Sequence, residues 1–130
     1  MKLSTRKILK HSHALSQLGK TFPAQTKANI IRNIQVLAPF VECYNALNQS
    51  LIQEVSPDGE SDSIDQSPKL LAVWSRKRDE ILKTEYDAKG LAFLNWTDLD
   101  TAGVDPVTIE NLGFLVRGIP APKDEDLIPE

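Results

Sequence analysis

The feature that most constrains the fold of this chain is an unbroken repeat of mainly apolar residues in its first half. The repeat alternates spacings of four and three residues and comprises Ile30, Ile34, Leu37, Val41, Tyr44, Asn48, Leu51 and Val55. Such spacing places side chains along one narrow stripe of an α-helix, as in antiparallel helix pairs and coiled coils. The repeat therefore predicts one long helix over about residues 24–55, roughly 48 Å in length at 1.5 Å per residue.

Two residues complicate this helix. Pro39 lacks a backbone donor and its ring crowds the carbonyl group of Gln35, so we expect a kink or a break there. Asn48 is a polar residue within the apolar stripe. It either fixes the register of a buried helix pair or faces water at the less buried end of the helix, and the sequence leaves both interpretations open.

Capping signals predict three further helices. The first spans residues 4–18, is capped by Ser4 or Thr5, and ends at a left-handed Gly19. The other two begin with a capping residue followed by proline, at Ser67-Pro68 and Asp105-Pro106. These helices are expected over about 68–84 and 106–117, with Gly118 ending the last. Their expected buried residues are Leu71, Trp74 and Ile81 with Leu70 and Leu82, and then Ile109, Leu112 and Leu115 or Val116.

The connecting segments differ in character. Residues 56–67 are polar and acidic and are expected to form a mobile loop. Residues 91–96, "LAFLNW", are either a short strand or an extended segment lying across the helices, and Thr97 can cap a single turn at 98–102. The tail at 119–130 has three prolines and four acids and is expected to be disordered.

These segments define a mainly α fold within a single domain of residues 1–118. The first and second helices form a helical hairpin with a long second helix, on which the third helix packs. A small C-terminal cap contains a short strand and the last helix.

The net charge of −3 conceals a strong asymmetry. Residues 1–41 carry seven bases and no acid, whereas residues 42–130 carry all 18 acids against eight bases. This division is compatible with a nucleic-acid face, with a face for an acidic partner, or with basic helices that pack against the protein's own acidic half.

Two groups of residues are candidates for binding a partner. The first group lies on the basic first helix, and the second joins an aromatic residue to arginines, which often anchor protein interfaces. Trp74 is equally explained as a core residue, because tryptophan is highly buried on average. The candidates are Arg6, Lys7, Lys10, Trp74, Arg76 and Arg78.

Two segments partly match motifs for nucleotide and calcium binding, but each lacks residues that its motif requires. Gly19-Lys20-Thr21 matches the end of a phosphate-binding loop, but Ala14 stands where that loop needs its first glycine, and a helix precedes it. In the acidic loop, Ser63 and Lys69 occupy the places where a calcium loop needs glycine and glutamate. We therefore expect neither ligand.

The remaining reactive residues have structural explanations. His11 and His13 point in opposite directions on a helix and cannot grip one metal ion together. Acids are dense at Asp98, Asp100, Asp105 and Glu110, but turn and cap chemistry accounts for three of them. We assign no catalytic residue, metal or cofactor and expect no enzymatic activity.

The expected location is the cytoplasm. The single Cys43 cannot form an internal disulfide, and its neighbours do not favour a reactive thiolate. No segment approaches the roughly 20 apolar residues that span a bilayer, and the N-terminus has no apolar run long enough for a signal peptide. No membrane partner is expected.

Residues 14–55 resemble the N-terminal part of a family of small proteins of tailed bacteriophages. The matching residues are Ala14, Leu15, Leu18, Pro23, Arg32, Asn33, Ile34 and Leu37. The later "ILKTEYDA" and "TDLDTAGVDPVTIENL" are similar to the family's C-terminal half, so the resemblance extends over residues 5–117. It implies a phage gene product, from a neighbourhood of virion or host-takeover genes. The family has no established activity to carry over.

The expected function is non-enzymatic binding of another protein, either in virion assembly or in inhibition of a host factor. Nucleic-acid binding through the basic N-terminal segment is the alternative. The protein is then expected in the host cell cytoplasm or in the virion, and the apolar stripe of the long helix offers a surface for homo-oligomers.

Overall fold

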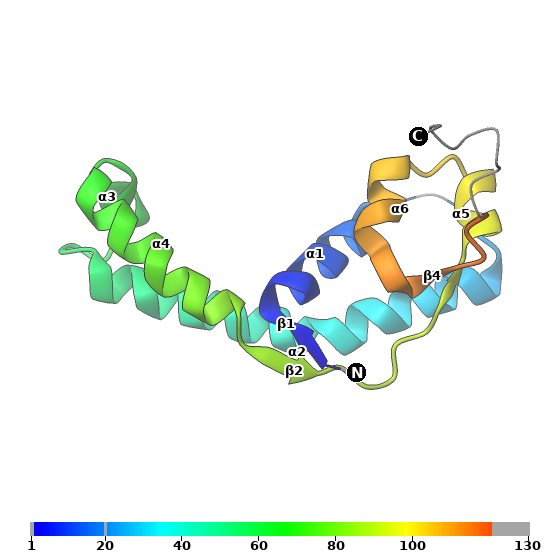
Figure 1. The fold of residues 1–130 in the computed structure, drawn as a ribbon, viewed down its shortest axis with the longest axis horizontal. Coiled ribbons are helices and arrows are strands. Elements are labelled where there is room, and N and C mark those ends of the chain that lie inside the picture. Colours follow the sequence, from blue (N-terminus) through cyan, green and yellow to red (C-terminus); the bar gives the residue numbers. More distant parts are fainter. Residues whose placement is uncertain (1, 20, 121–130) are drawn as a thin grey trace, which may run out of the picture.

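The long helix predicted from the apolar repeat forms the spine of the molecule (Figure 1). It is seen in a computed structural model that describes residues 2–19 and 21–120. This helix, α2, spans Ala24–Val55 and continues through Pro39 without a break. Pro39 and Gln35 are both exposed, so the carbonyl group that loses its partner lies on the solvent side of the helix.

Helices pack on both halves of α2. Helix α1, Thr5–Ser16, covers the N-terminal half, and α4, Pro68–Leu82, runs back along the C-terminal half after the short helix α3, Ser61–Asp65. Residues 44–55 of α2 with α3 and α4 form an arm that extends away from the rest of the molecule (Figure 1). The predicted helical hairpin and packed third helix are therefore confirmed.

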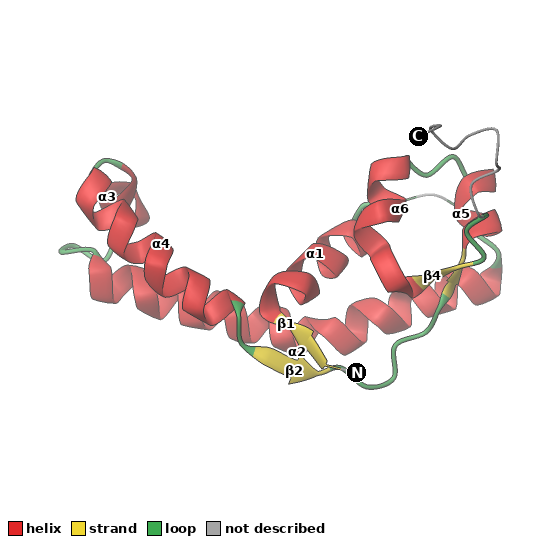
Figure 2. Cartoon of the chain, viewed as in Figure 1, coloured by secondary structure: helices red, strands yellow, loops and turns green. Residues whose placement is uncertain are grey.

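The C-terminal cap contains short helices and strands (Figure 2). Helix α5 spans Trp96–Thr101 and α6 spans Pro106–Leu112, followed by a single 3₁₀ turn, η1, at Gly113–Leu115. Strands β3, Leu94–Asn95, and β4, Val116–Arg117, pair in parallel.

A second pair of strands links the chain's beginning to its middle. Strand β1, Lys2–Ser4, pairs antiparallel with β2, Glu85–Asp87, and Leu3 lies opposite Tyr86. The pairing continues where the backbone N–H and the side-chain hydroxyl of Thr5 both donate to the carbonyl of Thr84, each at 2.8 Å. Neither of these three-residue strands was predicted from the sequence.

The main core lies between α1, the N-terminal half of α2 and the C-terminal cap. Its fully buried members include Ile8, Leu15, Leu37, Leu94, Leu99, Leu112 and Leu115. The buried residues of the arm, Tyr44, Leu51, Ile64 and Leu82, lie outside this cluster. The arm therefore has a small hydrophobic core of its own.

The apolar stripe of α2 is only partly buried. Ile30, Leu37, Tyr44 and Leu51, at intervals of seven, are buried, but Ile34 is 38% exposed. At that turn the buried position belongs to its neighbour Asn33, which is completely enclosed. In α4, Leu71 is also exposed, contrary to expectation, while Leu82 is buried.

Several helix ends differ from those predicted. Helix α1 ends at Ser16 and Gly19 has no left-handed conformation. The last helix ends at Leu112 rather than 117, because Gly113 adopts φ 56° and ψ −126° and turns the chain into η1 and β4. An added Cβ at Gly113 would lie 3.3 Å from Cε1 of His11.

The capping predictions were mostly confirmed. Ser67 accepts a hydrogen bond from the backbone N–H of Leu70, and Asp105 accepts one from Val107. The cap of α5, in contrast, is Asn95, which accepts from the N–H of Thr97 at 3.0 Å. Asparagine in this position satisfies an otherwise unpaired amide of the first turn.

The acidic loop has internal structure. It contains α3, and Asp58 accepts hydrogen bonds from the hydroxyls of Ser63 and Ser56 at 2.6 and 2.7 Å and from the N–H of Glu60 at 3.0 Å. These donors lower the pKa of Asp58 to about 2. The predictions for Lys20 and for the tail beyond Pro120 concern residues outside the described part of the chain.

Candidate protein-binding surface

Asn33 of α2 fixes the extended segment 90–93. Its Nδ2 donates to the carbonyl of Ala92 at 2.8 Å, and the N–H of Ala92 donates to its Oδ1 at 2.7 Å. One buried side chain thus satisfies both backbone groups of Ala92, as a neighbouring strand would. Of the two alternatives for residues 91–96, the extended segment lying across a helix is correct for 91–93, and only 94–95 form a strand.

Two neighbouring residues of α2 hold the same segment. Arg32 Nε donates to the carbonyl of Gly90 at 2.6 Å, and Asn29 Nδ2 donates more weakly to that of Phe93 at 3.4 Å. Gly90 has φ 88°, a left-handed conformation that lets the chain turn toward α2. These contacts give residues 90–93 a defined path without regular sheet pairing.

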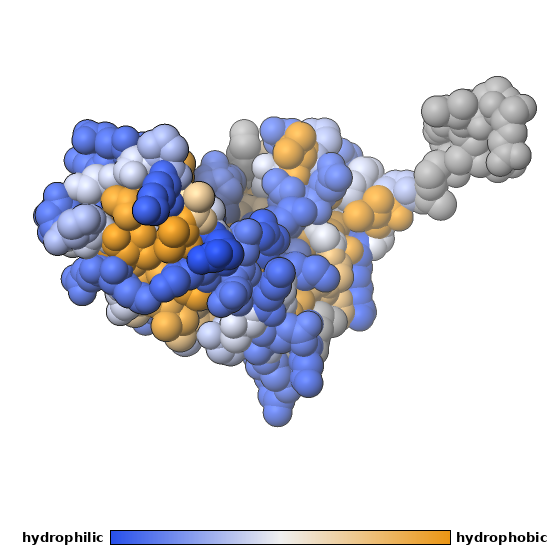
Figure 3. All heavy atoms as spheres, turned by 60° about the vertical axis from the view of Figure 1, so that its left-hand side comes forward, coloured by the Kyte–Doolittle hydropathy of each residue, from blue (hydrophilic) through white to orange (hydrophobic). Residues whose placement is uncertain are grey.

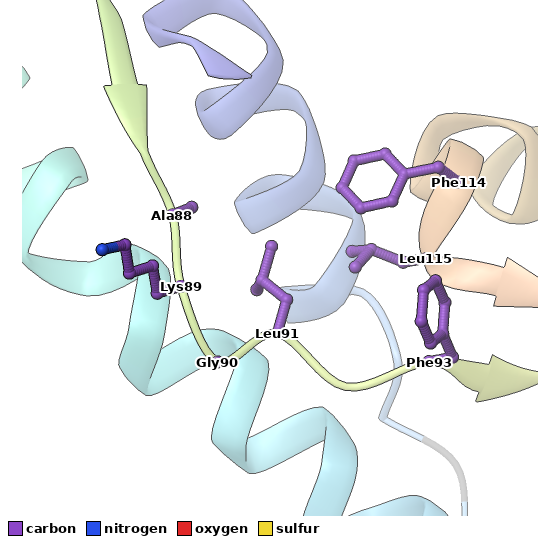
Figure 4. Close-up of a pocket in the computed structure, with 7 residues that line it drawn as sticks. All are labelled: Ala88, Lys89, Gly90, Leu91, Phe93, Phe114 and Leu115. Atoms are coloured by element: carbon purple, nitrogen blue, oxygen red, sulfur yellow. The ribbon is translucent and has the colours of Figure 1, made fainter. Parts of the chain in front are cut away.

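The fixed segment forms one wall of an apolar pocket of about 290 Å³ (Figure 4). Leu91, Phe114 and Leu115 turn their side chains toward one another, while Lys89 points away (Figure 4). The lining residues are Ala88, Lys89, Gly90, Leu91, Phe93, Phe114 and Leu115. The pocket can therefore receive an apolar side chain.

Phe93 stands between this pocket and a second one. Its side chain is 39% exposed, and the guanidinium carbon of Arg117 lies 3.3 Å from the centre of its ring. The second opening, about 320 Å³, is lined by Phe93, Leu94, Asn95, Arg117 and Gly118. Stacking on the ring limits the motion of both side chains while the donor groups of the guanidinium still have solvent access.

The structure brings two of the predicted site residues, Trp74 and Arg78, into contact on the arm. The Nε of Arg78 donates to the hydroxyl of Tyr44 at 2.9 Å, and its guanidinium lies 5.1 Å from the ring centre of Trp74. Arg6 forms an exposed ion pair with Asp79, at 3.6 Å. The exposed Arg76 lies on the same helix, α4.

Trp74 resolves the question left open for Asn48. Its Nε1 donates to Oδ1 of Asn48 at 3.1 Å, and both residues are half-buried. Asn48 therefore has a specific partner on α4, which fits a role in setting the register of the two arm helices. Trp74 is therefore only partly buried, and its indole N–H already has a partner.

Lys7 and Lys10 lie at a separate opening of about 320 Å³ between α1 and α6. Its other lining residues are His11, Glu110, Asn111, Gly113 and Phe114. Nδ1 of His11 lies 2.9 Å from the carbonyl of Asn111, as expected for a donating N–H.

The other ring nitrogen of His11, Nε2, is buried and has no hydrogen-bond partner in the described part of the chain. The ring packs edge-on against Phe114, with ring centres 5.2 Å apart. Burial lowers the pKa of His11, the bond to Asn111 opposes this, and the positive charges of Lys10 and Lys7 lower it further. The ring is therefore held in its neutral form.

Two acids of the C-terminal part have defined hydrogen-bond partners. Asp98 accepts a hydrogen bond from the hydroxyl of Thr26 at 2.5 Å, and Asp105 caps α6. Among residues 2–19 and 21–120, no three His, Cys, Asp or Glu side chains are placed to hold a metal ion together. Cys43 is exposed, with its Sγ 3.8 Å from the hydroxyl of Tyr86.

Comparison with known proteins identifies no family model, no curated protein and no solved structure that matches this chain. In the described residues, no helix combines the length and the apolar character needed to cross a membrane.

Sequence reasoning missed both Phe93 and Arg117. Arg117 was expected at the end of a helix, so nothing indicated that it lies beside residue 93. Phe93 carried one signal, because alternate residues of an extended segment face opposite sides. With Leu94 buried, its neighbour Phe93 is the residue that turns outward.

Proposed function

We propose that this protein acts without enzymatic activity, by binding another protein through Phe93 and the pockets on its two sides. The observation that carries the proposal is the exposed ring of Phe93, stacked by Arg117 between two openings. Aromatic and arginine residues beside well-formed pockets are enriched among the residues that dominate binding energy at interfaces.

The residues that line the two openings indicate which groups of a partner they can bind. An apolar side chain of the partner enters the pocket beside Leu91, Phe114 and Leu115. An acidic or carbonyl group accompanies it, because the exposed Arg117 supplies positive charge at the second opening. The surface is also preorganised, since Asn33 and Arg32 hold the wall of the pocket before any partner arrives.

The resemblance to proteins of tailed bacteriophages suggests where such binding takes place. It favours one of two partners, a component of the assembling virion or a host protein that is inhibited by the binding. In either case the binding takes place in the host cell cytoplasm. The candidate residues on α4 offer less to this partner than expected, because Trp74 and Arg78 already bind Asn48 and Tyr44.

Affinity capture from infected host cells tests the proposal, with the protein itself and two variants compared. Phe93→Ala is expected to lose the captured partner, whereas Val107→Ala, which trims an even more exposed apolar side chain on α6, is expected to retain it. Thermal melting establishes that both variants are folded. Capture of the same partner at the same yield by Phe93→Ala would refute the role of this surface.

The alternative, nucleic-acid binding, is favoured by one observation. Lys7 and Lys10 are both exposed at one opening on the basic helix α1, where a phosphate group can reach them. Arg6 contributes less, because it is paired with Asp79. The salt dependence of nucleic-acid binding separates the two functions.

A further inference from the structure

One flank of α2 carries an apolar stripe that the rest of the described chain leaves largely uncovered. Ile31 and Ile34 are 47% and 38% exposed, and Ala38 and Val41 continue the stripe at spacings of four and three with partial burial. Successive residues of a helix are about 100° apart. Arg32, which binds the carbonyl of Gly90, therefore points away from this flank.

The same flank reaches a small apolar notch on the arm. Ile52 follows Ile31 by three heptads, so it lies near the same side of α2 and roughly 32 Å along it. The notch, of about 40 Å³, is lined by Ile52, Ile64 and Trp74 together with Ser61 and Asp65. Figure 3, in which the arm is turned toward the viewer, shows an apolar patch on the arm surrounded by hydrophilic residues.

Charge changes sign along the stripe. Residues 24–41 of α2 carry no acid, and of their two bases Lys27 lies on this flank whereas Arg32 points away from it. Residues 42–65, which complete α2 and form α3, carry no base and six acids: Glu42, Glu54, Asp58, Glu60, Asp62 and Asp65. A second copy lying parallel would set these acids against one another, whereas an antiparallel copy brings Lys27 of each chain to the acidic end of the other.

We propose that a second copy of this chain packs antiparallel along this flank of α2, around a two-fold axis near Val41. Ile31 and Ile34 of each copy then lie at the Ile52 notch of the other, with Lys27 near the other copy's acidic α3. The contact is isologous. The patch of each copy packs on the notch of the other, so the same patch–notch contact forms twice in one dimer. It leaves Phe93 and its pockets free and does not depend on the function proposed for them.

Sedimentation velocity over a range of protein concentrations tests self-association. The unaltered protein is expected to form a dimer that weakens with salt, and Ile31→Asp is expected to weaken the dimer at least about tenfold. Val107→Asp places the same charge at a somewhat more exposed apolar position on α6 and is expected to dimerise normally. Circular dichroism establishes that each variant is folded. A protein that stays monomeric at all concentrations, or a dimer indifferent to Ile31→Asp, would overturn the proposal.

Spin labels determine the direction of the pair. With Cys43→Ser removing the only native thiol, a label at the exposed position Gln53→Cys reports one distance per dimer. The antiparallel arrangement puts the two labels roughly 35 Å apart, and a parallel one puts them within about 20 Å. The shorter distance would reject the proposed geometry even if the dimer forms.

Discussion

Asn33 and Ala92 are joined by two hydrogen bonds, of 2.8 and 2.7 Å, although 59 residues separate them in the chain. The amide of one buried side chain replaces the backbone of a neighbouring strand. Together with the bond from Arg32 to Gly90, this pair sets the path of residues 90–93 and therefore the shape of the pocket beside Phe93.

Replacing Asn33 should therefore destabilise the protein. Asn33→Ala leaves the N–H and carbonyl groups of Ala92 without partners, and we expect a loss of about 1–3 kcal/mol in the free energy of unfolding. Asn29→Ala is the matched control, because its bond to Phe93 is long at 3.4 Å, and it should change stability little. Urea denaturation measures both. Equal effects of the two variants would show that the Asn33 pair has no special role.

The two faces of the α2 stripe should respond differently to truncation. Leu37 is fully buried, so Leu37→Ala should cost about 2–5 kcal/mol through lost burial and the cavity left behind. Ile34→Ala, at an exposed position one turn earlier, should cost much less. Thermal melting at a low protein concentration compares them. A small loss for Leu37→Ala would mean that the core does not close over α2.

Stability should fall as the pH drops below the ordinary range of histidine. The folded-state pKa of His11 lies below its value of 6.5 in an unfolded chain, mainly because of burial. Between the folded and unfolded pKa values the unfolded chain binds more protons, so stability is fully present above the unfolded value and decreases as pH falls toward the folded one. The slope contributed by this group is at most about 1.4 kcal/mol per pH unit.

Urea denaturation at about pH 7.5 and 5.5 measures this dependence. His11→Gln should weaken it, since glutamine can donate to Asn111 without titrating. His13→Gln, at an exposed position two residues away, should preserve it. If His11→Gln and the unaltered protein lose stability in parallel, protonation of His11 is not the cause.

Nucleic-acid binding should be weak. We expect no DNA or RNA affinity tighter than about 10 μM at physiological salt, because the overall charge is negative and no aromatic residue is interleaved with the first bases. Fluorescence anisotropy across about 50–300 mM salt measures it. Submicromolar binding with a log–log slope of roughly −3 to −4, abolished by Arg6→Glu with Lys10→Glu, would instead support the alternative function.

The elements that the sequence determined are those whose signals are local. The course of α2 from Ile30 to its end at Val55 follows from a repeat in which each residue is three or four positions from the next. The starts of α4 and α6 follow from Ser67 and Asp105, each bonded to an amide two or three residues away. Such interactions form within one or two helical turns, so residue type and spacing suffice to predict them.

Tertiary structure alone decided which side of each element is buried and where the candidate surface lies. Ile34 is exposed and Asn33 buried because a segment about 60 residues away supplies the partner that asparagine needs. Arg117 reaches Phe93 because Gly113 ends α6 early and β4 then pairs with β3. These outcomes depend on contacts between residues that are far apart in the sequence and come together only when long loops close. The periodicity of residues along the chain does not predict such contacts.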